Sequence, residues 1–224
     1  MFSSVVEGSK GERTRALIRQ VALRSFRERG YEATTVRLIA EEAGVSLGVT
    51  NYHFPSKNHL VQELYLEVTR QFHQAASERM AGTDDLVGRL RIGFETGIEV
   101  LEPYHGFAPG FLSAAMSPRS PINPLSGESE PALAEAIAVF REAVQGARHR
   151  LPADIAEALP EVLTIAYLLL ALFFTYDRSP GQARTRALLT GGLGLLGMAL
   201  PLVRMPVLRR PLRELLELIA QVRA

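Results

Sequence analysis

The sequence predicts an all-α protein in which a three-helix unit at the N-terminus precedes a larger helical domain. Apolar residues recur at helical spacing through most of the 224 residues, and hardly any segment has the pattern of a strand. Between Thr34 and Lys57 two short helices are expected on either side of a tight turn. Two helices this short cannot bury a core alone, so the helix before them must complete the unit. We place the domain boundary between residues 56 and 57, and expect order from about residue 10.

Composition fits one or two globular domains, because 47% of the residues are hydrophobic. The net charge of +1 does not mark the whole chain as a polyanion binder. Residues 1–57 carry nine basic and six acidic residues, a local net charge of +3 that fits a few phosphate contacts. The absence of cysteine excludes disulfides and thiolate metal sites.

The first helix is predicted to begin after Ser9, which stands three residues before Glu12 as in a capping box. It should extend to about Arg29 and end at Gly30. Its apolar side is expected to complete the core of the three-helix unit: Ile18, Val21, Ala22 and Phe26. Three arginines near its start either contact phosphates or form a solvated basic face: Arg13, Arg15 and Arg19.

Capping residues mark both short helices that follow. The Thr35 hydroxyl can cap the first, and Gly44 supplies the left-handed backbone that ends it. Ser46 is expected to cap the second, Leu47 to Phe54, which stops because a residue before proline is pushed out of helical geometry. This geometry is that of a helix-turn-helix, whose second helix enters the DNA major groove. The alternative is an ordinary helical hairpin with solvated polar residues.

A long helix is predicted from Lys57 to about Met80, with Ser56 as its cap and an apolar face of residues spaced by four: Leu60, Leu64, Val68 and Phe72. Another should run from Asp84 to Leu101. Three glycines interrupt it and leave room for a ligand or for close helix packing, of which we favour packing: Gly88, Gly93 and Gly97.

Prolines separate the helices that follow. The segment Pro103–Pro131 holds six prolines and cannot be one helix, although a short helix from about Phe107 to Met116 is expected. A helix from Pro131 to about Arg150 comes next, with four inward-facing residues: Leu133, Ile137, Phe140 and Val144.

Two strongly apolar helices are expected at about residues 154–177 and 181–203. Because both are apolar on more than one side, something must cover them, and the same helices of a second copy are the natural cover. Their apolar runs, Val162–Tyr176 and Leu188–Val203, are shorter than the roughly 18 to 20 residues of a membrane span, so we expect no membrane. An amphipathic helix at Pro206–Ala224 should pack on the body of the protein rather than on a membrane surface.

From about Arg13 to Phe72 the chain resembles the DNA-binding domain of the TetR family of bacterial transcription regulators. The matching residues span the whole unit: Ile18, Ala22, Phe26, Gly30-Tyr31, Thr34-Thr35-Val36, Ile39-Ala40, Ala43-Gly44-Val45-Ser46, Gly48, Tyr52-His53-Phe54-Pro55-Ser56-Lys57 and Leu60. One departure is Asn51, since the family usually has aromatic residues at both this position and the next. Asparagine forms bidentate contacts with adenine, so the operator sequence does not follow from better-known members.

The resemblance implies a helix-turn-helix DNA-binding domain at residues 1–56 and a ligand-binding and dimerisation domain at 57–224. We expect a homodimer on double-stranded operator DNA, paired through the helices at about 154–177 and 181–203. Base contacts are expected from Arg37, Leu47, Gly48, Val49 and Asn51, and phosphate contacts from Thr35, Tyr52, His53 and Lys57, with Ser46 beside them.

The function expected is that of a repressor released from its operator by a small apolar effector. An activator or a ligand-independent regulator with the same DNA-binding unit is the alternative, and a helical membrane-associated binding protein is a more distant one. Candidate ligand-binding residues, which ordinary core packing would equally explain, are Phe72, Phe94, Tyr104, Phe107, Phe111, Met116 and Tyr167.

No pattern in the sequence indicates an enzyme, a metal site or a cofactor. The five histidines stand in no recognised metal-ligand or nucleophile motif, and no glycine-rich phosphate loop follows a strand. Residues Met1–Ser9 lack the features of a secretory signal, so the expected location is the cytoplasm.

Overall fold

The computed structural model describes residues 9–106, 115, 120–149, 151–200 and 214. The helices predicted at 107–116 and 206–224 lie outside the described residues, apart from Ala115 and Glu214. Within the described ranges every regular element is a helix. The α-helices are α1 (Lys10–Ala33), α2 (Val36–Glu42), α3 (Leu47–His53), α4 (Lys57–Met80), α5 (Leu86–Leu101), α7 (Glu130–Gln145), α8 (Ala153–Tyr176) and α9 (Ala183–Ala199). Three short 3-10 helices are η1 (Glu102–Tyr104), η2 (Gly127–Ser129) and η3 (Pro180–Gln182).

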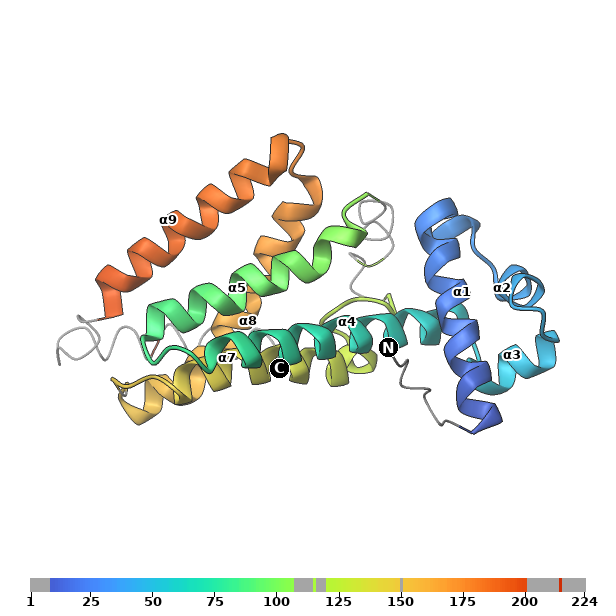
Figure 1. The fold of residues 1–224 in the computed structure, drawn as a ribbon, viewed down its shortest axis with the longest axis horizontal. Coiled ribbons are helices and arrows are strands. Elements are labelled where there is room, and N and C mark those ends of the chain that lie inside the picture. The colour runs from blue at the N-terminus through green and yellow to red at the C-terminus, as the bar shows by residue number, and fades with distance from the viewer. Residues whose placement is uncertain (1–8, 107–114, 116–119, 150, 201–213, 215–224) are drawn as a thin grey trace, which may run out of the picture.

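Two groups of helices share the long helix α4 (Figure 1). The head, by which we mean α1, α2 and α3, lies together at one end of the molecule. The first turns of α4 lie against α1, and the rest of α4 runs into the body, by which we mean α5, α7, α8 and α9. One helix therefore belongs to both packing units.

The predicted caps of the head are confirmed. The Ser9 amide donates to Glu12 Oε2 over 2.6 Å and the Glu12 amide donates to Ser9 Oγ over 3.3 Å, which completes the capping box. Thr35 Oγ1 accepts from the Leu38 amide, and Ser46 Oγ accepts from the Val49 amide. Gly44 has a φ of 65° and ends α2 as expected. Local side-chain chemistry thus sets both edges of the turn.

Two predictions about helix ends were wrong, the cap of α4 and the end of α7. The helical geometry breaks at Gly30 as predicted, with a φ of 83°, although α1 resumes beyond this kink and ends at Ala33. Ser56 stands at the start of α4 without capping its backbone, because its hydroxyl bonds to His59 Nδ1 at 2.8 Å. α7 ends at Gln145 rather than near Arg150.

A buried arginine from another helix binds the end of α7. The buried Arg89 side chain of α5 donates Nε to the Ala143 carbonyl over 3.0 Å and Nη2 to the Glu142 carbonyl over 2.9 Å. Its Nη1 donates to the carbonyls of Met80 and Thr83 at the end of α4. One guanidinium therefore binds four carbonyls around the ends of α4 and α7, of which Glu142 also accepts from the Gly146 amide and Met80 from the Thr83 amide.

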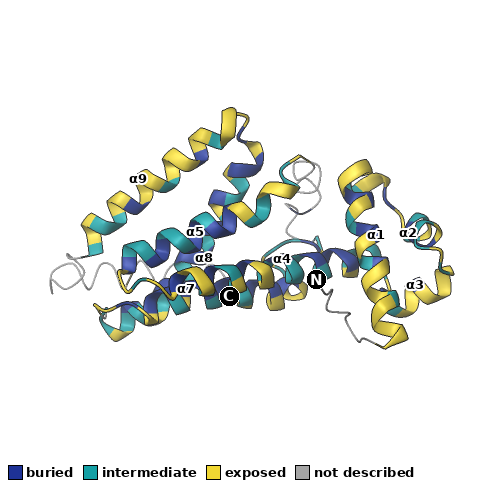
Figure 2. Ribbon diagram, viewed as in Figure 1, coloured by how far each residue is buried: buried dark blue, intermediate teal, exposed yellow. Residues whose placement is uncertain are grey.

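The body encloses the larger hydrophobic core, which α4, α5, α7 and α8 supply, and the four inward residues predicted for the helix after Pro131 are all buried. Gly93 and Gly97 serve packing: a Cβ at Gly97 would lie 2.5 Å from Tyr167 Cε2. α9 differs from the other body helices. Only Thr185 and Leu193 are buried in it, and Figure 2 shows it exposed along most of its length.

Candidate nucleic-acid interface and ligand cavity

Packing of the head determines which residues of α3 meet solvent. Side chains from the head and from the start of α4 form one hydrophobic cluster: Ile18, Val21, Ala22, Phe26, Ile39, Phe54, Leu60 and Val61. Within α3 only Thr50 is buried, and its hydroxyl donates to the Ser46 carbonyl over 3.2 Å. The rest of α3 is exposed or half-buried.

The exposed residues of α3 form a surface with mixed chemistry. Tyr52 is 83% exposed, Val49 40% and Leu47 38%, and Ser46, Gly48 and Asn51 are exposed beside them. Two aliphatic side chains and a phenol ring in solvent on a seven-residue helix are unusual for a face that binds nothing. The polar groups among them can hydrogen-bond, whereas the aliphatic groups suit a thymine methyl.

Gly48 has no structural role inside the protein. Its φ is not positive, and a Cβ added there would meet only Ser46 Oγ, at 3.8 Å. Since glycine destabilises a helix relative to alanine, the fold alone would favour alanine at this position. The missing side chain leaves the backbone of α3 open to close approach from outside.

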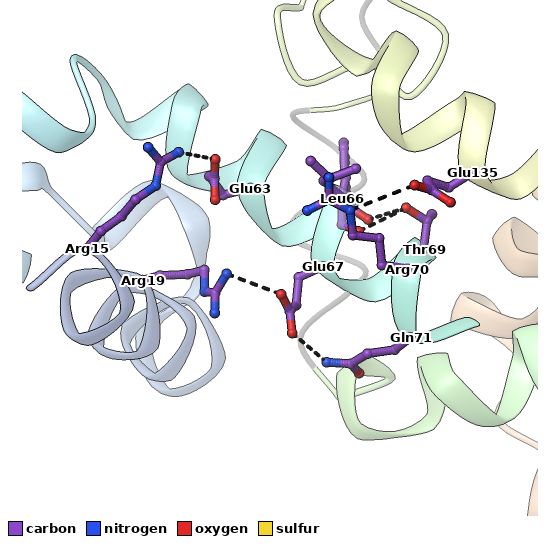
Figure 3. A network of polar contacts seen from close by, with 10 residues as sticks. Arg15, Arg19, Glu63, Leu66, Glu67, Thr69, Arg70, Gln71 and Glu135 are labelled. Carbon is purple, nitrogen blue, oxygen red and sulfur yellow. Dashed lines mark hydrogen bonds and ion pairs between the residues drawn. The ribbon is translucent and has the colours of Figure 1, made fainter. Parts of the chain in front are cut away.

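The charges of the head divide into paired and unpaired groups. Arg15 and Arg19 of α1 form ion pairs with Glu63 and Glu67 of α4, the second at 3.1 Å (Figure 3). Two further arginines of α1 pair with Glu42: Arg24 at 3.6 Å and Arg29 at 2.6 Å. Arg37 is exposed and has no ion pair among the described residues. Arg15 and Arg19, left open by the sequence, thus form ion pairs between the head and α4, whereas Arg37 remains exposed.

Two of the predicted phosphate contacts are half-buried. Lys57 Nζ donates to the Tyr31 carbonyl over 2.8 Å and lies 3.8 Å from the centre of the Tyr31 ring. Burial lowers the pKa of the Lys57 ammonium. His53 packs edge-on against Tyr52, with ring centres 5.1 Å apart. Lys57 therefore fixes the start of α4 to the end of α1, a role the sequence did not suggest.

A cavity of about 470 Å³ lies in the body against α4 and α8. Its volume is within the range typical of small-molecule sites. The described wall is almost entirely apolar and includes Leu64, Val68, Leu101, Ala132, Leu133, Ala136, Ile165, Leu168, Leu169, Ala171, Leu172 and Phe174. No Asp, Glu, Lys or Arg belongs to the described part of the wall.

Polar groups of the wall bond within the protein. His105 Nε2 donates to the carbonyls of Phe174 and Asp177, at 3.0 and 3.1 Å, and so closes the end of α8. The Tyr65 hydroxyl donates to the Ile122 carbonyl over 2.9 Å, and burial raises its pKa. Thr69 Oγ1 and Thr175 Oγ1 donate to carbonyls one turn earlier in their own helices. The described wall thus offers a ligand mainly apolar contact.

The predicted ligand-binding residues take different places. Tyr104 and Tyr167 line the cavity. Phe72 does not line it and instead stacks on Tyr167, with ring centres 5.1 Å apart, and Phe94 packs against Phe140 at 4.8 Å. The other three candidates lie outside the described residues: Phe107, Phe111 and Met116.

Several wall residues were not predicted as ligand contacts. Leu64 and Val68 were expected only as part of the apolar face of α4, which is the side that meets the cavity. Tyr65 lies in α4 and Asn123 in the connection between α5 and α7, and the two share no sequence pattern. Only their common position in the fold reveals them.

α8 and α9 leave apolar side chains in solvent. On α8 these are Leu169 at 62%, Phe173 at 42% and Tyr176 at 54% exposed, and on α9 they are Leu188 at 52%, Leu195 at 66% and Met198 at 65%. The two helices are joined through η3, and the Asp177 carboxylate accepts hydrogen bonds from Ser179 and Thr185 at that corner. Those bonds hold the pKa of Asp177 well below its usual range.

By length and composition α8 could cross a membrane, although its apolar run in the sequence is shorter than a membrane span. The folded helix has 24 residues, and an 18-residue window of it has a mean hydropathy of 1.9. Its place in the structure explains this composition, because Leu163, Tyr167, Leu170 and Phe174 belong to the core of the body. A core helix of a folded domain passes the same test of composition.

Two family models match the chain. Residues 18–64 match bacterial regulatory proteins of the tetR family, and residues 89–218, more than half of the chain, match the Tetracyclin repressor-like C-terminal domain. The HTH-type transcriptional repressor KstR2 of Rhodococcus jostii is 37% identical over 92 residues, which are 41% of this chain and 37% of KstR2. The chain spans about a third of the length of the curated relatives it matches.

Solved structures share the fold. The TetR transcriptional regulator from Nitrosomonas europaea has a TM-score of 0.62 at 19% identity, over 81% of this chain and 96% of that one. Thermus thermophilus FadR, a transcriptional repressor solved in complex with lauroyl-CoA, has a TM-score of 0.57 at 21% identity, over 79% and 93%. The all-helical fold and the family predicted from the sequence are confirmed. The chain belongs to the TetR family of DNA-binding transcriptional regulators, a family without enzymatic activity.

Proposed function

We propose that this chain is a repressor that binds a near-palindromic operator as a homodimer and leaves it when a small, uncharged, apolar molecule enters the cavity. One observation carries the proposal: α4 belongs to both sites. Leu60 and Val61 at its start complete the core of the head, and Leu64, Tyr65 and Val68 line the cavity. A ligand in the cavity therefore contacts the helix on which the head is mounted.

In the proposed complex residues 1–56 bind DNA, with α3 in the major groove. Arg37, Leu47, Gly48, Val49 and Asn51 contact base edges, and Thr35, Ser46, Tyr52, His53 and Lys57 contact or approach phosphates. The exposure of α3 and the unpaired Arg37 support these assignments. An ammonium has three N–H donors, so the bond from Lys57 to Tyr31 leaves donors for a phosphate.

The proposed dimer pairs α8 and α9 with the same helices of a second copy. Support comes from the large apolar side chains that both helices leave in solvent, and from the small buried fraction of α9. A twofold interface of this kind sets the distance between the two α3 helices. Leu195→Arg should halve the mass in solution, measured by sedimentation, and abolish high-affinity operator binding. A dimer that persists in this variant would contradict the assignment.

The proposed effector is uncharged because the described wall has no Asp, Glu, Lys or Arg side chain that could pair with a charged group. The polar groups of the described wall already bond within the protein. A cavity of about 470 Å³ lies in the lower half of the range typical of small-molecule sites. Thermus thermophilus FadR was solved with lauroyl-CoA, a larger and charged molecule. We propose that this chain prefers a smaller, neutral lipophile.

The first experiment identifies the operator. Duplexes selected from a random pool by the purified protein should converge on an inverted repeat, and footprinting upstream of its own coding region should protect the same sequence. Asn51→Ala should relax the preferred base at one position in each half-site. Lys57→Ala should weaken all duplexes alike and flatten the salt dependence. Selection that yields no repeated half-site would refute a sequence-specific function.

The second experiment tests the effector class with matched probes of one chain length. 1-Dodecanol, laurate and lauroyl-CoA are titrated into the protein–operator complex, and fluorescence anisotropy of the labelled duplex reports release. We expect release by 1-dodecanol at a lower concentration than by laurate, and little release by lauroyl-CoA. Release by the charged probes alone would refute an uncharged effector.

A further inference from the structure

One short segment touches both the head and the cavity. Ile122, in the connection between α5 and α7, is 0% exposed and belongs to the hydrophobic cluster of the head, together with Ile18, Phe26 and Phe54. The next three residues line the cavity: Asn123, Pro124 and Leu125. The chain thus passes from the head core to the cavity wall within a single peptide bond.

Hydrogen bonds fix this segment to α4. The Tyr65 hydroxyl donates to the Ile122 carbonyl over 2.9 Å, and Gln62 Nε2 donates to the Pro121 carbonyl over 2.7 Å. On the other side of Ile122, Ser129 Oγ contacts the Asn123 carbonyl at 2.8 Å and Gln62 Oε1 at 3.1 Å. Residues on both flanks of Ile122 are therefore tied to the same turn of α4.

Two residues belong to both the head cluster and the cavity wall themselves, whereas Ile122 does not line the cavity. Tyr65 packs against the head cluster and lines the cavity, and Ala115 is buried in that cluster and also lines the cavity. The head is also tied to α4 by residues that do not line the cavity: Leu60 and Val61 fill its core, Tyr31 bonds to Lys57 and Asn58, and the ion pairs Arg15–Glu63 and Arg19–Glu67 have side chains that are a quarter to a half exposed. Exposed ion pairs of this kind are weak. Close-packed side chains, in contrast, transmit small displacements because interiors have little free volume.

We propose that Ile122 is the residue through which occupancy of the cavity changes the position of the head. This inference rests on the proposed function and adds the route by which release occurs. A ligand that displaces Asn123, Pro124 or Leu125 acts on Ile122 across one peptide bond and on Tyr65 through its hydrogen bond. Since Ile122 fills the head core, the head must shift relative to α4 or lose this contact.

The test uses a double-mutant cycle that requires no effector. Ala136→Leu places extra volume at a buried residue of the cavity wall and serves as a permanent stand-in for a ligand. Allosteric couplings typically lie between 5-fold and 150-fold. Ala136→Leu should therefore weaken binding to the selected operator at least 5-fold in the unaltered chain, and less than 2-fold when Ile122→Ala is also present.

Ile39→Ala is the matched control, because Ile39 of α2 is also 0% exposed in the head cluster and does not line the cavity. In a protein that carries Ile39→Ala, the further substitution Ala136→Leu should still weaken operator binding at least 5-fold, even though the head loses stability. Ile122→Val, which removes one methyl group, should give an intermediate effect and covers the case in which Ile122→Ala does not fold. Thermal unfolding of each variant reports folding independently of DNA binding.

The outcomes separate the two proposals. If neither Ala136→Leu nor any of the three probes weakens operator binding in the unaltered chain, ligand-controlled release is refuted, and the proposed role of Ile122 is refuted with it. If they weaken binding equally with and without the Ile122 substitutions, the proposed function stands and Ile122 is not the link. An equal loss of coupling in Ile39→Ala would also refute a specific role for Ile122.

Discussion

Replacement of Gly48 by alanine should stabilise the protein and weaken its binding to DNA. Gly48 is the second residue of α3, and the nearest heavy atom to an added Cβ is Ser46 Oγ at 3.8 Å, an ordinary contact distance. Alanine is favoured over glycine by up to about 1 kcal/mol inside a helix, and by less near its start. For a protein of this size, roughly 0.5 kcal/mol raises the melting temperature by about 1 to 2 °C.

The same methyl group would stand between α3 and the DNA. A lost or strained contact at one base pair costs about 1 kcal/mol or more, and a twofold dimer meets it twice. A loss of about 2 kcal/mol corresponds to operator binding that is roughly 30-fold weaker. Circular dichroism measures the melting temperature, and fluorescence anisotropy of the selected operator measures the dissociation constant.

Gly82→Ala provides the control, because an added Cβ in this turn after α4 meets no heavy atom within 4 Å and lies far from α3 in the sequence. It should leave operator binding unchanged. If Gly48→Ala raises the melting temperature while operator binding stays within twofold of the unaltered protein, the start of α3 does not approach DNA closely. The assignment of α3 as the recognition helix would then be wrong.

Three further predictions concern the body. Gly146→Ala should destabilise the protein by about 1 to 3 kcal/mol in denaturant unfolding, because its Cβ would lie 2.3 Å from Arg89 Nη2 and displace a guanidinium that satisfies four carbonyls; unchanged stability would refute that role. Gly97→Ala should lower the free energy of unfolding by about 1 to 3 kcal/mol, because Tyr167 must move to make room for the added Cβ. The same variant should weaken the binding of 1-dodecanol, measured by calorimetry. Unaltered binding would show that Tyr167 moves away from the cavity. Asp177→Asn should lower stability at neutral pH. Hydrogen bonds, chiefly from Ser179, lower the pKa of Asp177, so the stability that its carboxylate contributes is present above about pH 4 and is lost on acidification. The melting temperatures of the two proteins should therefore converge at low pH. A difference in melting temperature that widens on acidification would contradict this expectation.

The head was predictable because its boundaries depend on neighbouring residues. Thr35 and Ser46 cap their helices through amides three residues ahead, and Gly44 supplies a backbone geometry that few other residues adopt. Ser56 shows the limit of this local reasoning. It occupies the capping position of α4, but its hydroxyl forms a hydrogen bond with the side chain of His59, three residues later, and does not bond to the helix backbone.

The parts that the sequence did not predict depend on distant contacts. The carbonyls of Glu142 and Ala143 near the end of α7 bind Arg89, which lies more than fifty residues earlier. The cavity brings together residues of α4, α5, α7 and α8 with the segment before η2, and no periodicity links them. Ile122 lies among prolines and serines, where the composition indicated only a loop.

The sparse burial of α9 has a consequence for the proposed dimer. A helix with two buried residues out of seventeen contributes little to an isolated chain, so in the proposed dimer its stability would come from association. The melting temperature of the protein should then rise with its concentration, and occupancy of the operator should rise more steeply than the amount of protein made. Under the proposed repression, the controlled gene would be transcribed below a threshold concentration of this protein and repressed above it.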